Sequence, residues 1–514
     1  MICIPITGST QDEALLQIEM SLSRAHVLEL RMDLIRGELQ TLMDKCRSYP
    51  VAAKILVTNR RRGPSAPEES RGEGQRVSLL EEAVRLRVDY VDIELDTAEP
   101  LRQRVLAAAR AHGNRTKVII SHHDFRKTPS FKTLKDIFHD SMESGASVAK
   151  IVTLAKSPED NFTVLSLIPY ARNMRKDIIA FCMGEEGRES RVIAPLIGSY
   201  LSFASLNEGL ASAPGQLTVG EMENVLNIAG RGVFRKGKLS VPPNAKIFGI
   251  LGNPVKQSLS PLMHDAALRK MKIAGKYLPF CIQDIASALR GIRGIGIRGV
   301  GVTMPYKVDV MQHLDEVDDD AHKIGAVNTI VNDNGRLKGL NTDWIGLVQS
   351  LREFMDIRGR VFAILGAGGT ARAAVFGIKR EGGIPVIVNR NIAKGERLAK
   401  EWACPFYPLS ELDKVKADCL INTTPVGMMP NTGESPVSGA ILVNYRWVMD
   451  VIYNPLKTRL MRDAEEAGCI TISGLGMFIH QGAEQIRVWT GQEAPRDLMK
   501  QVVRERLLYG NKTG

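Results

Sequence analysis

The sequence is poor in aromatic residues, in paired cysteines and in long apolar runs. Phe, Trp and Tyr make up only 5% of the 514 residues, so few rings are available to stack on nucleic-acid bases. The formal net charge is +11, but apart from a cluster at Arg60, Arg61 and Arg62 the basic residues are spread along the chain. We therefore expect no nucleic-acid partner.

The seven cysteines form no Cys-x-x-Cys pair, and their odd number argues against a disulfide framework or a structural zinc site. This usage is typical of a reducing compartment. No uncharged apolar run reaches about 18 residues, and the N-terminal MICIPITGST has no basic segment ahead of an apolar one. We expect no metal, no membrane span and no signal peptide, and a cytoplasmic location.

Apolar residues make up 44% of the chain and occur in the first half as short runs separated by helix-like segments. The runs are nearly continuous rather than alternating, which is typical of parallel strands buried on both faces. Eight of them predict a (β/α)8 TIM barrel over residues 1–235. They read ICIPIT, HVLELRM, AKILVT, YVDIEL, KVIIS, VAKIVTLA, IIAFCM and LSFASL.

Glycines, basic residues and a Pro-Pro pair then mark a linker over about residues 230–244. The strand AKIFGILGN opens a second α/β unit, predicted over residues 244–345. A strand, a glycine turn and a helix in RVFAILGAGGTARAAV open a Rossmann domain, predicted over residues 346–475. The fold class is therefore α/β, with two or three domains.

Lys150 interrupts an apolar predicted strand, where an ammonium ion is costly unless it is paired or neutral. A desolvated lysine near other cations has a lowered pKa and can attack a ketone to form an imine. A buried lysine–carboxylate pair without catalytic function explains the residue equally well.

Other polar residues lie at the carboxyl ends of the predicted barrel strands, where barrel enzymes place their chemistry. Glu29, Arg31 and Asp33 are spaced by two, so they share a face that could bind an anion or form a core ion-pair network. His123, at the end of the fifth predicted strand, could transfer protons near neutral pH.

The pieces ELRMD, SHHDFRKTP, KIV, SR and SAPGQ together resemble type I 3-dehydroquinate dehydratase over about residues 1–229. The resemblance implies that Lys150 forms a Schiff base with the substrate ketone and that His123 is general base and then general acid. It implies support by Asp33 and Glu94. The substrate-binding residues that it implies are Glu29, Arg31, Arg60, Arg191, Ser212 and Gln216.

The chain departs from this family after Arg60, because the usual EGG element is replaced by RRRGPSAPEESRGEGQ. The Gly, Ser and Pro content of the loop at residues 61–76 suits a mobile lid.

In the second half, hydroxyls, amides, one ammonium and one carboxylate suggest a site for a polyol. Ser258 and Ser260 precede a predicted helix, which they could merely cap, and Thr303 and Lys307 lie in VTMPYK. Asn328, Asn341 and Asp343 follow in AVNT and NTD.

The glycine turn GAGGTA holds Gly366, Gly368 and Gly369, with Ala371 in the place of a third spaced glycine. After a strand and before a helix, such a turn indicates a dinucleotide site more than a plain tight turn. The next predicted strand, PVIVNR, ends in Asn389 and Arg390 rather than Asp or Glu. With Lys394 nearby, this favours NADP over NAD.

These blocks, with NTTPVGM and GMFIHQGA, resemble shikimate dehydrogenase over about residues 246–508, with residues 476–508 completing the substrate-binding domain. The resemblance implies that Lys307 and Asp343 are catalytic. It implies substrate binding by Ser258, Ser260, Thr303, Asn328 and Gln481, and NADP binding by Gly366, Ala367, Gly368, Gly369, Asn389, Arg390, Lys394, Thr423 and Met477. Two departures are Gly301, where Asn is frequent, and Ser473, where Asp is frequent.

Together these observations predict a bifunctional enzyme that converts 3-dehydroquinate to 3-dehydroshikimate and then to shikimate. Its partners would be these small molecules, and nothing in the sequence sets an oligomeric state. The alternatives are a class I aldolase for the first half, a quinate dehydrogenase for the second, and a scaffold with one decayed half. The presence of Lys150, His123, Lys307 and Asp343 disfavours the scaffold.

Overall fold

The computed structural model describes residues 1–49, 53–61, 72–226, 234–235, 238–239, 245–255 and 257–510. The chain divides into two compact units. One comprises Met1–Ala245 with Ser287–Gly296, and the other comprises Lys246–Ala286 with Ile297–Gly514.

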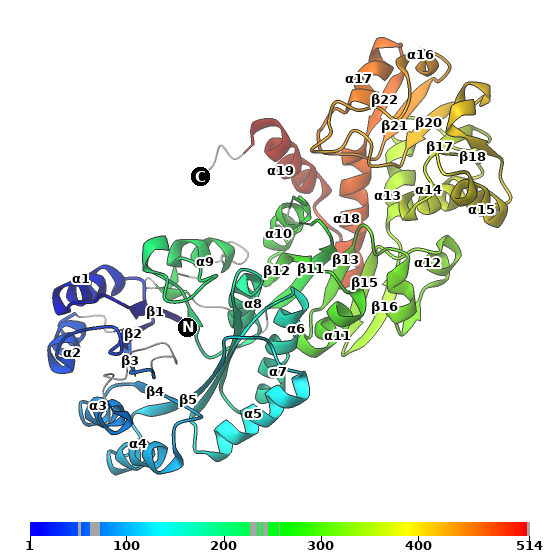
Figure 1. The fold of residues 1–514 in the computed structure, drawn as a ribbon. Coiled ribbons are helices and arrows are strands. Elements are labelled where there is room, and N and C mark those ends of the chain that lie inside the picture. The colour runs from blue at the N-terminus through cyan, green and yellow to red at the C-terminus, as the bar shows by residue number, and fades with distance from the viewer. Residues whose placement is uncertain are drawn as a thin grey trace. The chain divides into compact units, whose positions relative to one another are not determined.

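The first unit contains a parallel eight-stranded sheet in the order β7-β6-β5-β4-β3-β2-β1-β8 (Figure 1). The sheet curls into a near-closed barrel, since the Tyr200 amide just before β8 donates to the Ile178 carbonyl of β7 at 2.8 Å. The strands are β1 (Ile2–Ile6), β2 (Val27–Arg31), β3 (Lys54–Thr58), β4 (Tyr90–Glu94), β5 (Lys117–Asp124), β6 (Val148–Leu154), β7 (Ile178–Met183) and β8 (Ser202–Phe203).

Helices follow the barrel strands along the chain. They are α1 (Gln11–Ser21), α2 (Leu39–Arg47), α3 (Glu73–Arg85), α4 (Glu99–Ala111), α5 (Phe131–Glu143), α6 (Glu159–Leu165), α7 (Leu167–Asn173), α8 (Arg188–Ile197), the short 3-10 helix η1 (Glu208–Leu210) and α9 (Val219–Leu226). Local sequence signals set their ends. For example, Thr10 and Glu13 form a capping box at α1, each side chain accepting from the other residue's backbone N–H.

All eight predicted strands are present, and every residue of β1, β2 and β7 is buried, as the continuous apolar runs indicated. The fifth strand, β5, ends in His122, His123 and Asp124 as predicted, and these last residues remain paired with β6. Of the predicted linker, the structure describes β9 (Phe234–Arg235) and β10 (Lys238–Leu239), an antiparallel pair. The rest of residues 230–244 lies outside the described residues.

The second unit holds two sheets, the first in the order β12-β11-β13-β15-β16-β14 with mixed strand directions. Its strands are β11 (Lys246–Gly252), β12 (Gly275–Cys281), β13 (Gly299–Val302), β14 (Glu316–Val317), β15 (Thr329–Asp333) and β16 (Arg336–Leu340). The helices of this unit along the same stretch are α10 (Ser260–Lys270), η2 (Asp309–His313), α12 (Asp319–Ile324) and α13 (Asp343–Arg352). The helix α11 (Ile285–Ile295) also lies in this stretch of the sequence, but from Ser287 on it belongs to the first unit.

The other sheet is entirely parallel, in the order β19-β18-β17-β20-β21-β22. This is the strand order of a Rossmann fold, whose switch point lies between β17 and β20. Its strands are β17 (Val361–Leu365), β18 (Ile384–Asn389), β19 (Phe406–Pro408), β20 (Cys419–Asn422), β21 (Trp447–Asp450) and β22 (Ile470–Ser473). Its helices, together with the two C-terminal helices, are α14 (Gly369–Arg380), α15 (Ile392–Trp402), η3 (Leu409–Lys414), α16 (Gly439–Leu442), α17 (Arg459–Glu466), α18 (Gly474–Thr490) and α19 (Arg496–Tyr509).

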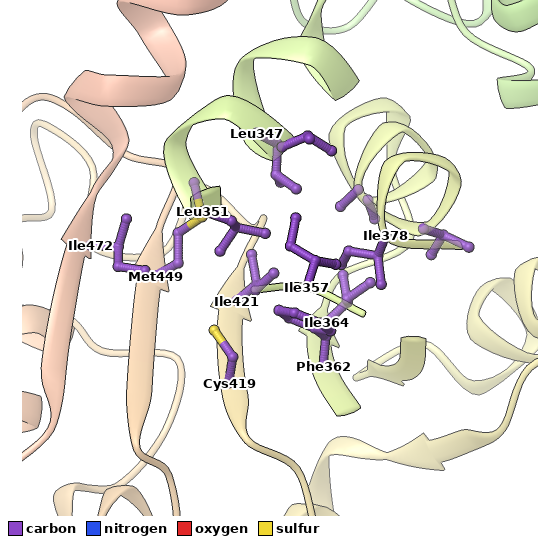
Figure 2. Close-up of a cluster of buried hydrophobic side chains, with 14 of the residues drawn as sticks. Leu347, Leu351, Ile357, Phe362, Ile364, Ile378, Cys419, Ile421, Met449 and Ile472 are labelled. Carbon is purple, nitrogen blue, oxygen red and sulfur yellow. The ribbon is translucent and has the colours of Figure 1, made fainter. Parts of the chain in front are cut away.

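A buried apolar cluster fixes one face of this sheet against its helices (Figure 2). Leu347 and Leu351 of α13 and Ile378 of α14 pack with Ile421 and Met449 of β20 and β21. The predicted α/β class, a barrel followed by a Rossmann-type unit, is thus confirmed. Within the described ranges, no helix combines the length and the apolar character needed to cross a membrane.

Candidate active sites

In the barrel, Lys150 is buried within β6 beside two carboxylates. Its Nζ donates to Asp92 Oδ2 at 2.7 Å and lies 3.9 Å from Glu29 Oε1. Asp92 also accepts from Ser121 Oγ at 2.6 Å, and Glu29 accepts from Thr58 Oγ1 at 2.7 Å. The lysine–carboxylate pair that the sequence allowed is therefore present, and it offsets the positive charge of Lys150 inside the barrel.

The charges around Lys150 also act on Asp92 and His123. Burial alone would raise the pKa of Asp92, but the charges of Lys150 and Arg60 and the hydrogen bonds from Lys150 and Ser121 outweigh it and lower the pKa. The pKa of His123 falls well below its usual value, first because of burial and then because Arg60, Lys150 and other cations repel a proton. His123 is therefore neutral at pH 7, as a general base must be.

Three donors of the predicted binding residues are buried without any hydrogen-bond partner in the described part of the chain: Arg60 Nε, Arg191 Nε and Gln216 Nε2. Arg191 is only 2% exposed, and burial without a facing carboxylate lowers its pKa to about 10. Buried donors normally have acceptors, so their absence here points to a ligand rich in oxygen and negative charge.

Aromatic rings connect Arg191 with the lysine. The Arg191 guanidinium lies 4.7 Å from the centre of the Phe181 ring, and Phe181 contacts Phe203 with ring centres 5.8 Å apart. Lys150 Nζ lies 4.5 Å from the Phe203 ring centre. The Lys150 amine and the Arg191 guanidinium therefore flank the same pair of rings.

The remaining predicted barrel residues have partners that orient them. Arg31 Nε and Nη2 bind the Asp33 carboxylate at 2.9 and 2.6 Å. Gln216 Oε1 accepts from the Ser212 amide and hydroxyl at 2.7 and 3.0 Å, which leaves its buried Nε2 as the donor without a partner among the described residues. Of the predicted lid at residues 61–76, positions 62–71 lie outside the described residues.

Glu94, predicted as support, is held by the backbone amide of Arg61 at 2.8 Å and by Arg76 Nη1 at 2.6 Å. Arg76 also donates to the Asn59 carbonyl at 3.0 Å, so this network fixes the backbone on both sides of Arg60.

In the second unit, Lys307 and Asp343 form an ion pair with 2.5 Å between Nζ and Oδ2. Asn328 Nδ2 donates to the other oxygen, Asp343 Oδ1, at 2.7 Å. Asn341 Oδ1 accepts from the Asp343 amide at 3.0 Å, and its Nδ2 donates to the Ala326 carbonyl at 2.8 Å. The structure thus brings the two predicted catalytic residues together and fixes their carboxylate from several sides.

The predicted serines lie where α10 begins. Ser260 is the first residue of the helix, and Ser258 Oγ accepts from its amide at 3.2 Å. Tyr453, which the sequence analysis did not single out, makes a hydrogen bond with Ser258. Burial raises the pKa of Tyr453, and this hydrogen bond offsets part of the rise. Its ring stacks on Phe478 at 4.0 Å. Tyr453 is therefore a further candidate of this site.

Thr303 and Gln481 have local roles in this structure. The Thr303 amide donates to the Leu251 carbonyl at 2.9 Å, which ties the turn after β13 to β11. Gln481 Nε2 donates to the Phe478 carbonyl of its own helix at 2.8 Å. In the described part of the chain neither side chain hydrogen-bonds to Lys307 or Asp343, so a role toward substrate stays a prediction for both.

The glycine turn lies at the carboxyl end of β17, beside the switch point. Gly366 has φ +118°, and a Cβ there would lie 2.6 Å from Thr423 Oγ1, so only glycine fits. Thr423 donates to the Leu365 carbonyl at 2.6 Å, and Gly368 caps α14 with no heavy atom near its Cβ position. Ala367 packs at the edge of the apolar cluster. The open space over Gly368 at a helix N-terminus fits a pyrophosphate.

The residues predicted to select NADP over NAD lie around the end of β18 and the start of α15. Asn389 is the last residue of β18, Arg390 follows it, and Lys394 lies in the first turn of α15. Asn389 Nδ2 donates to the Asn391 carbonyl at 2.8 Å, while Arg390 and Lys394 are exposed. Within the described residues neither cation has an ion-pair partner, which leaves both available for a 2′-phosphate. Met477 is buried in α18 against the apolar cluster.

The two departures from the family pattern have structural explanations. A Cβ on Gly301 would lie 3.2 Å from Gln485 Nε2, so an amide from α18 occupies the space that a side chain at this position would enter. Gln485 in turn donates to Thr329 Oγ1 at 3.1 Å. Ser473 caps α18 by accepting from the Leu475 amide at 3.3 Å, the role that Asp would otherwise serve.

The sequence did not single out Asp92 as the partner of Lys150, although a signal existed. Each places an isolated charge in a buried strand of the same predicted barrel, and two such charges need each other. Gln485 carried no comparable signal, since it looks like any polar residue of an amphipathic helix.

Comparisons with known proteins agree with this geometry. The family model of type I 3-dehydroquinase matches residues 2–232, that of the shikimate dehydrogenase substrate-binding domain matches residues 250–330, and that of the shikimate 5′-dehydrogenase C-terminal domain matches residues 474–504. A bifunctional 3-dehydroquinate dehydratase/shikimate dehydrogenase of Arabidopsis thaliana, described as chloroplastic, is 31% identical over 98% of this chain and 84% of its own length.

The second half has relatives of its own. Shikimate dehydrogenase (NADP(+)) of Pyrococcus furiosus is 44% identical over 50% of this chain and 94% of its own. A crystal structure of shikimate dehydrogenase with NADP+ is 38% identical, covers 52% of this chain and 98% of its own, and has a TM-score of 0.50. The chain therefore belongs to the family of bifunctional 3-dehydroquinate dehydratase/shikimate dehydrogenases.

Proposed function

We propose that this enzyme dehydrates 3-dehydroquinate to 3-dehydroshikimate in the barrel and reduces the product to shikimate with NADPH in the second unit. The dehydratase would occupy residues 1–235. The substrate-binding domain of the dehydrogenase would occupy residues 244–345 and be completed by 476–508, with the NADP domain at residues 346–475. The observation that carries the proposal is the buried Lys150–Asp92 pair beside buried donors that lack acceptors.

In the first reaction, the nitrogen of Lys150 bonds to the carbon of the substrate ketone, and the ketone oxygen leaves as water with two of the ammonium protons. The product is a protonated imine, whose charge the neighbouring Asp92 carboxylate stabilises. Neutral His123 then removes a proton from the carbon next to the imine, whose nitrogen takes up the electron pair as an enamine. The enamine expels the hydroxyl, which His123 protonates as it leaves as water. Hydrolysis of the imine releases 3-dehydroshikimate and restores Lys150.

Arg191 and Arg60 hold the substrate in this scheme. A carboxylate would supply the acceptors that the buried guanidinium nitrogens lack, and ring hydroxyls would meet Gln216 and Glu29. The buried arginine donors fit any anionic substrate, and it is the SHHDFRKTP and SAPGQ segments that favour the dehydratase over a class I aldolase.

In the second reaction, Lys307 donates a proton to the carbonyl oxygen that becomes a hydroxyl, and Asp343 holds the ammonium in place. Asn328 keeps the carboxylate oriented through its second oxygen. Bound NADPH supplies the hydride, and its phosphates would lie over Gly368 at the start of α14 with the 2′-phosphate near Arg390 and Lys394. Ser258, Ser260 and Tyr453 would bind the substrate carboxylate.

The proposal is tested by supplying purified protein with 3-dehydroquinate and NADPH and following the products by mass spectrometry. Shikimate should form with one NADPH consumed per molecule. The second assignment is wrong if quinate with NAD is a better substrate pair than shikimate with NADP. The first is wrong if borohydride added with 3-dehydroquinate leaves Lys150 unmodified.

Cysteine chemistry supports the proposed cytoplasmic location. All seven cysteines lie in the described part of the chain, none forms a disulfide, and Cys3, Cys46, Cys182, Cys419 and Cys469 are buried. Fractionation of source cells should therefore place the activity with the cytoplasmic proteins. Recovery of the activity in an organelle fraction would contradict this location.

The pH profile of the dehydratase should reflect the lowered pKa of His123. The base acts when neutral, so kcat/KM should fall only as the pH drops below about 6.5, the ordinary pKa of histidine. Arg60→Gln removes one of the charges that lower this pKa and should move the acidic limb to higher pH, whereas Arg126→Gln, an exposed substitution, should not. An acidic limb above pH 6.5 in the wild type would contradict the assignment of His123 as the general base.

Cofactor choice should depend on Arg390. Arg390→Ala should raise KM for NADPH about tenfold, through loss of a charge-assisted contact, and leave KM for NADH unchanged. Lys400→Ala, an exposed cation at the far end of α15, is the matched control. Equal changes for both cofactors would argue that Arg390 does not contact the 2′-phosphate.

A further inference from the structure

The first residue of α14, Gly369, lies directly against the side chain of Lys307. A Cβ added to Gly369 would lie 3.2 Å from Lys307 Cβ, 3.3 Å from Lys307 Cδ and 3.6 Å from Ala326 Cβ. The neighbouring Gly368 differs, since a Cβ there would meet no heavy atom within 4 Å. Of these two adjacent glycines, only Gly369 packs against the stem of the ammonium group.

Backbone conformation does not explain the glycine at position 369. Gly369 begins an α-helix and is absent from the positions with positive φ, so an alanine would be accommodated by the backbone and favoured by helix propensity. What an alanine changes is the packing against Lys307. Its Cβ would approach two carbons of the stem more closely than ordinary van der Waals contact, and the nearer one cannot move without the backbone.

Lys307 has little freedom to move away while keeping its ion pair. Its carbonyl accepts from the Val327 amide at 2.7 Å, and the next residue of that segment, Asn328, binds the carboxylate that Lys307 also binds. A lysine held at its backbone by this segment and at Nζ by Asp343 must shift its side-chain torsions if it is pushed near Cβ.

We infer that Gly369 is a positioning residue for the dehydrogenase reaction, which gives the Lys307 stem the room that keeps its ammonium group on Asp343 and under the reacting oxygen. This rests on the proposed role of Lys307 as proton donor. The glycine turn then serves two functions with adjacent residues. Gly368 leaves space for the pyrophosphate, and Gly369 leaves space for the catalytic side chain.

The test compares Gly369→Ala with Gly368→Ala in the full-length protein, measuring kcat, KM for NADPH and the NADPH dissociation constant by fluorescence titration. Gly369→Ala should lower kcat about tenfold, because small displacements of a reacting group are costly, and should change NADPH affinity less than about twofold. Gly368→Ala, which fills the space proposed for the pyrophosphate, should instead weaken NADPH binding. A thermal melting curve for each variant establishes that it is folded.

A double-mutant cycle separates positioning from a general structural effect. In a Lys307→Ala background the Cδ contact is gone, so Gly369→Ala should lower the residual kcat by less than twofold. An equal tenfold loss in both backgrounds would overturn the inference, as would a Gly369→Ala enzyme with wild-type kcat and weakened NADPH binding. If Lys307→Ala itself retained wild-type kcat, the proposed role of Lys307 would fail instead.

Discussion

Lys150→Ala should abolish dehydration while leaving the reduction of 3-dehydroshikimate intact. Without the amine no imine forms, and the carbanion at the neighbouring carbon has no electron sink, so kcat should fall by at least about ten-thousandfold. With 3-dehydroquinate and NADPH the variant should consume almost no NADPH, and with 3-dehydroshikimate and NADPH it should behave as wild type. Borohydride with 3-dehydroquinate should add the mass of the reduced adduct to wild type only.

Lys156→Ala is the matched control for this experiment. Lys156 is exposed just beyond β6 and has no part in the proposed site, so its loss should change neither activity nor trapping. Because Lys150→Ala leaves Asp92 buried without its main cation, a melting curve must accompany the kinetics. A folded Lys150→Ala variant that still dehydrates 3-dehydroquinate would exclude the Schiff-base mechanism.

A carboxylate variant, Asp92→Asn, tests whether a negative charge beside Lys150 is needed for imine formation. The amide can still accept the Ser121 hydroxyl but no longer offsets the charge of Lys150 or of a protonated imine. Imine formation should therefore slow, with a lower trapping rate rather than none. Trapping as fast as in wild type would assign this role to another carboxylate, such as Glu29 at 3.9 Å.

The barrel could be predicted from the sequence because strands buried on both faces have an unmistakable composition. Where a polar residue interrupted such a run, as at Lys150, the position itself indicated a special environment. The carboxylate partner of Lys150 was harder to predict, because Asp92 is separated from Lys150 by 58 residues. Only the parallel register of β4, β5 and β6 brings the two side chains together. Sequence periodicity contains no information on that register.

In the dehydrogenase site too, the sequence indicated the catalytic residues but not which residues pack against them. VTMPYK and NTD placed Lys307 and Asp343 at strand ends, and the 2.5 Å ion pair follows from that placement. The contact between Gly369 and Lys307 could not be predicted, because a glycine in a nucleotide turn already has a sufficient explanation in the phosphate that it faces. Which of two adjacent glycines faces a catalytic side chain depends on the packing of two sheets of the second unit.

Lys307→Ala should impair reduction and leave dehydration intact, the reverse of Lys150→Ala. Removal of a positioned general acid typically costs 10²–10⁴-fold, so we expect kcat for reduction to fall about a thousandfold. Supplied with 3-dehydroquinate and NADPH, the variant should accumulate 3-dehydroshikimate at the wild-type dehydration rate. Its NADPH affinity should change little, because the proposed cofactor residues all lie outside the VTMPYK segment.

The control for Lys307→Ala is Lys338→Ala, which removes an exposed lysine of β16 whose partner is Glu316 at the surface. That exposed pair contributes little, and both activities should survive its loss. Asp343→Asn should resemble Lys307→Ala if the pair acts as a unit, and the double variant should then be no slower than either single one. Additive losses would mean that Asp343 contacts the substrate independently, in which case the 2.5 Å pair would orient the carboxylate at least as much as the lysine.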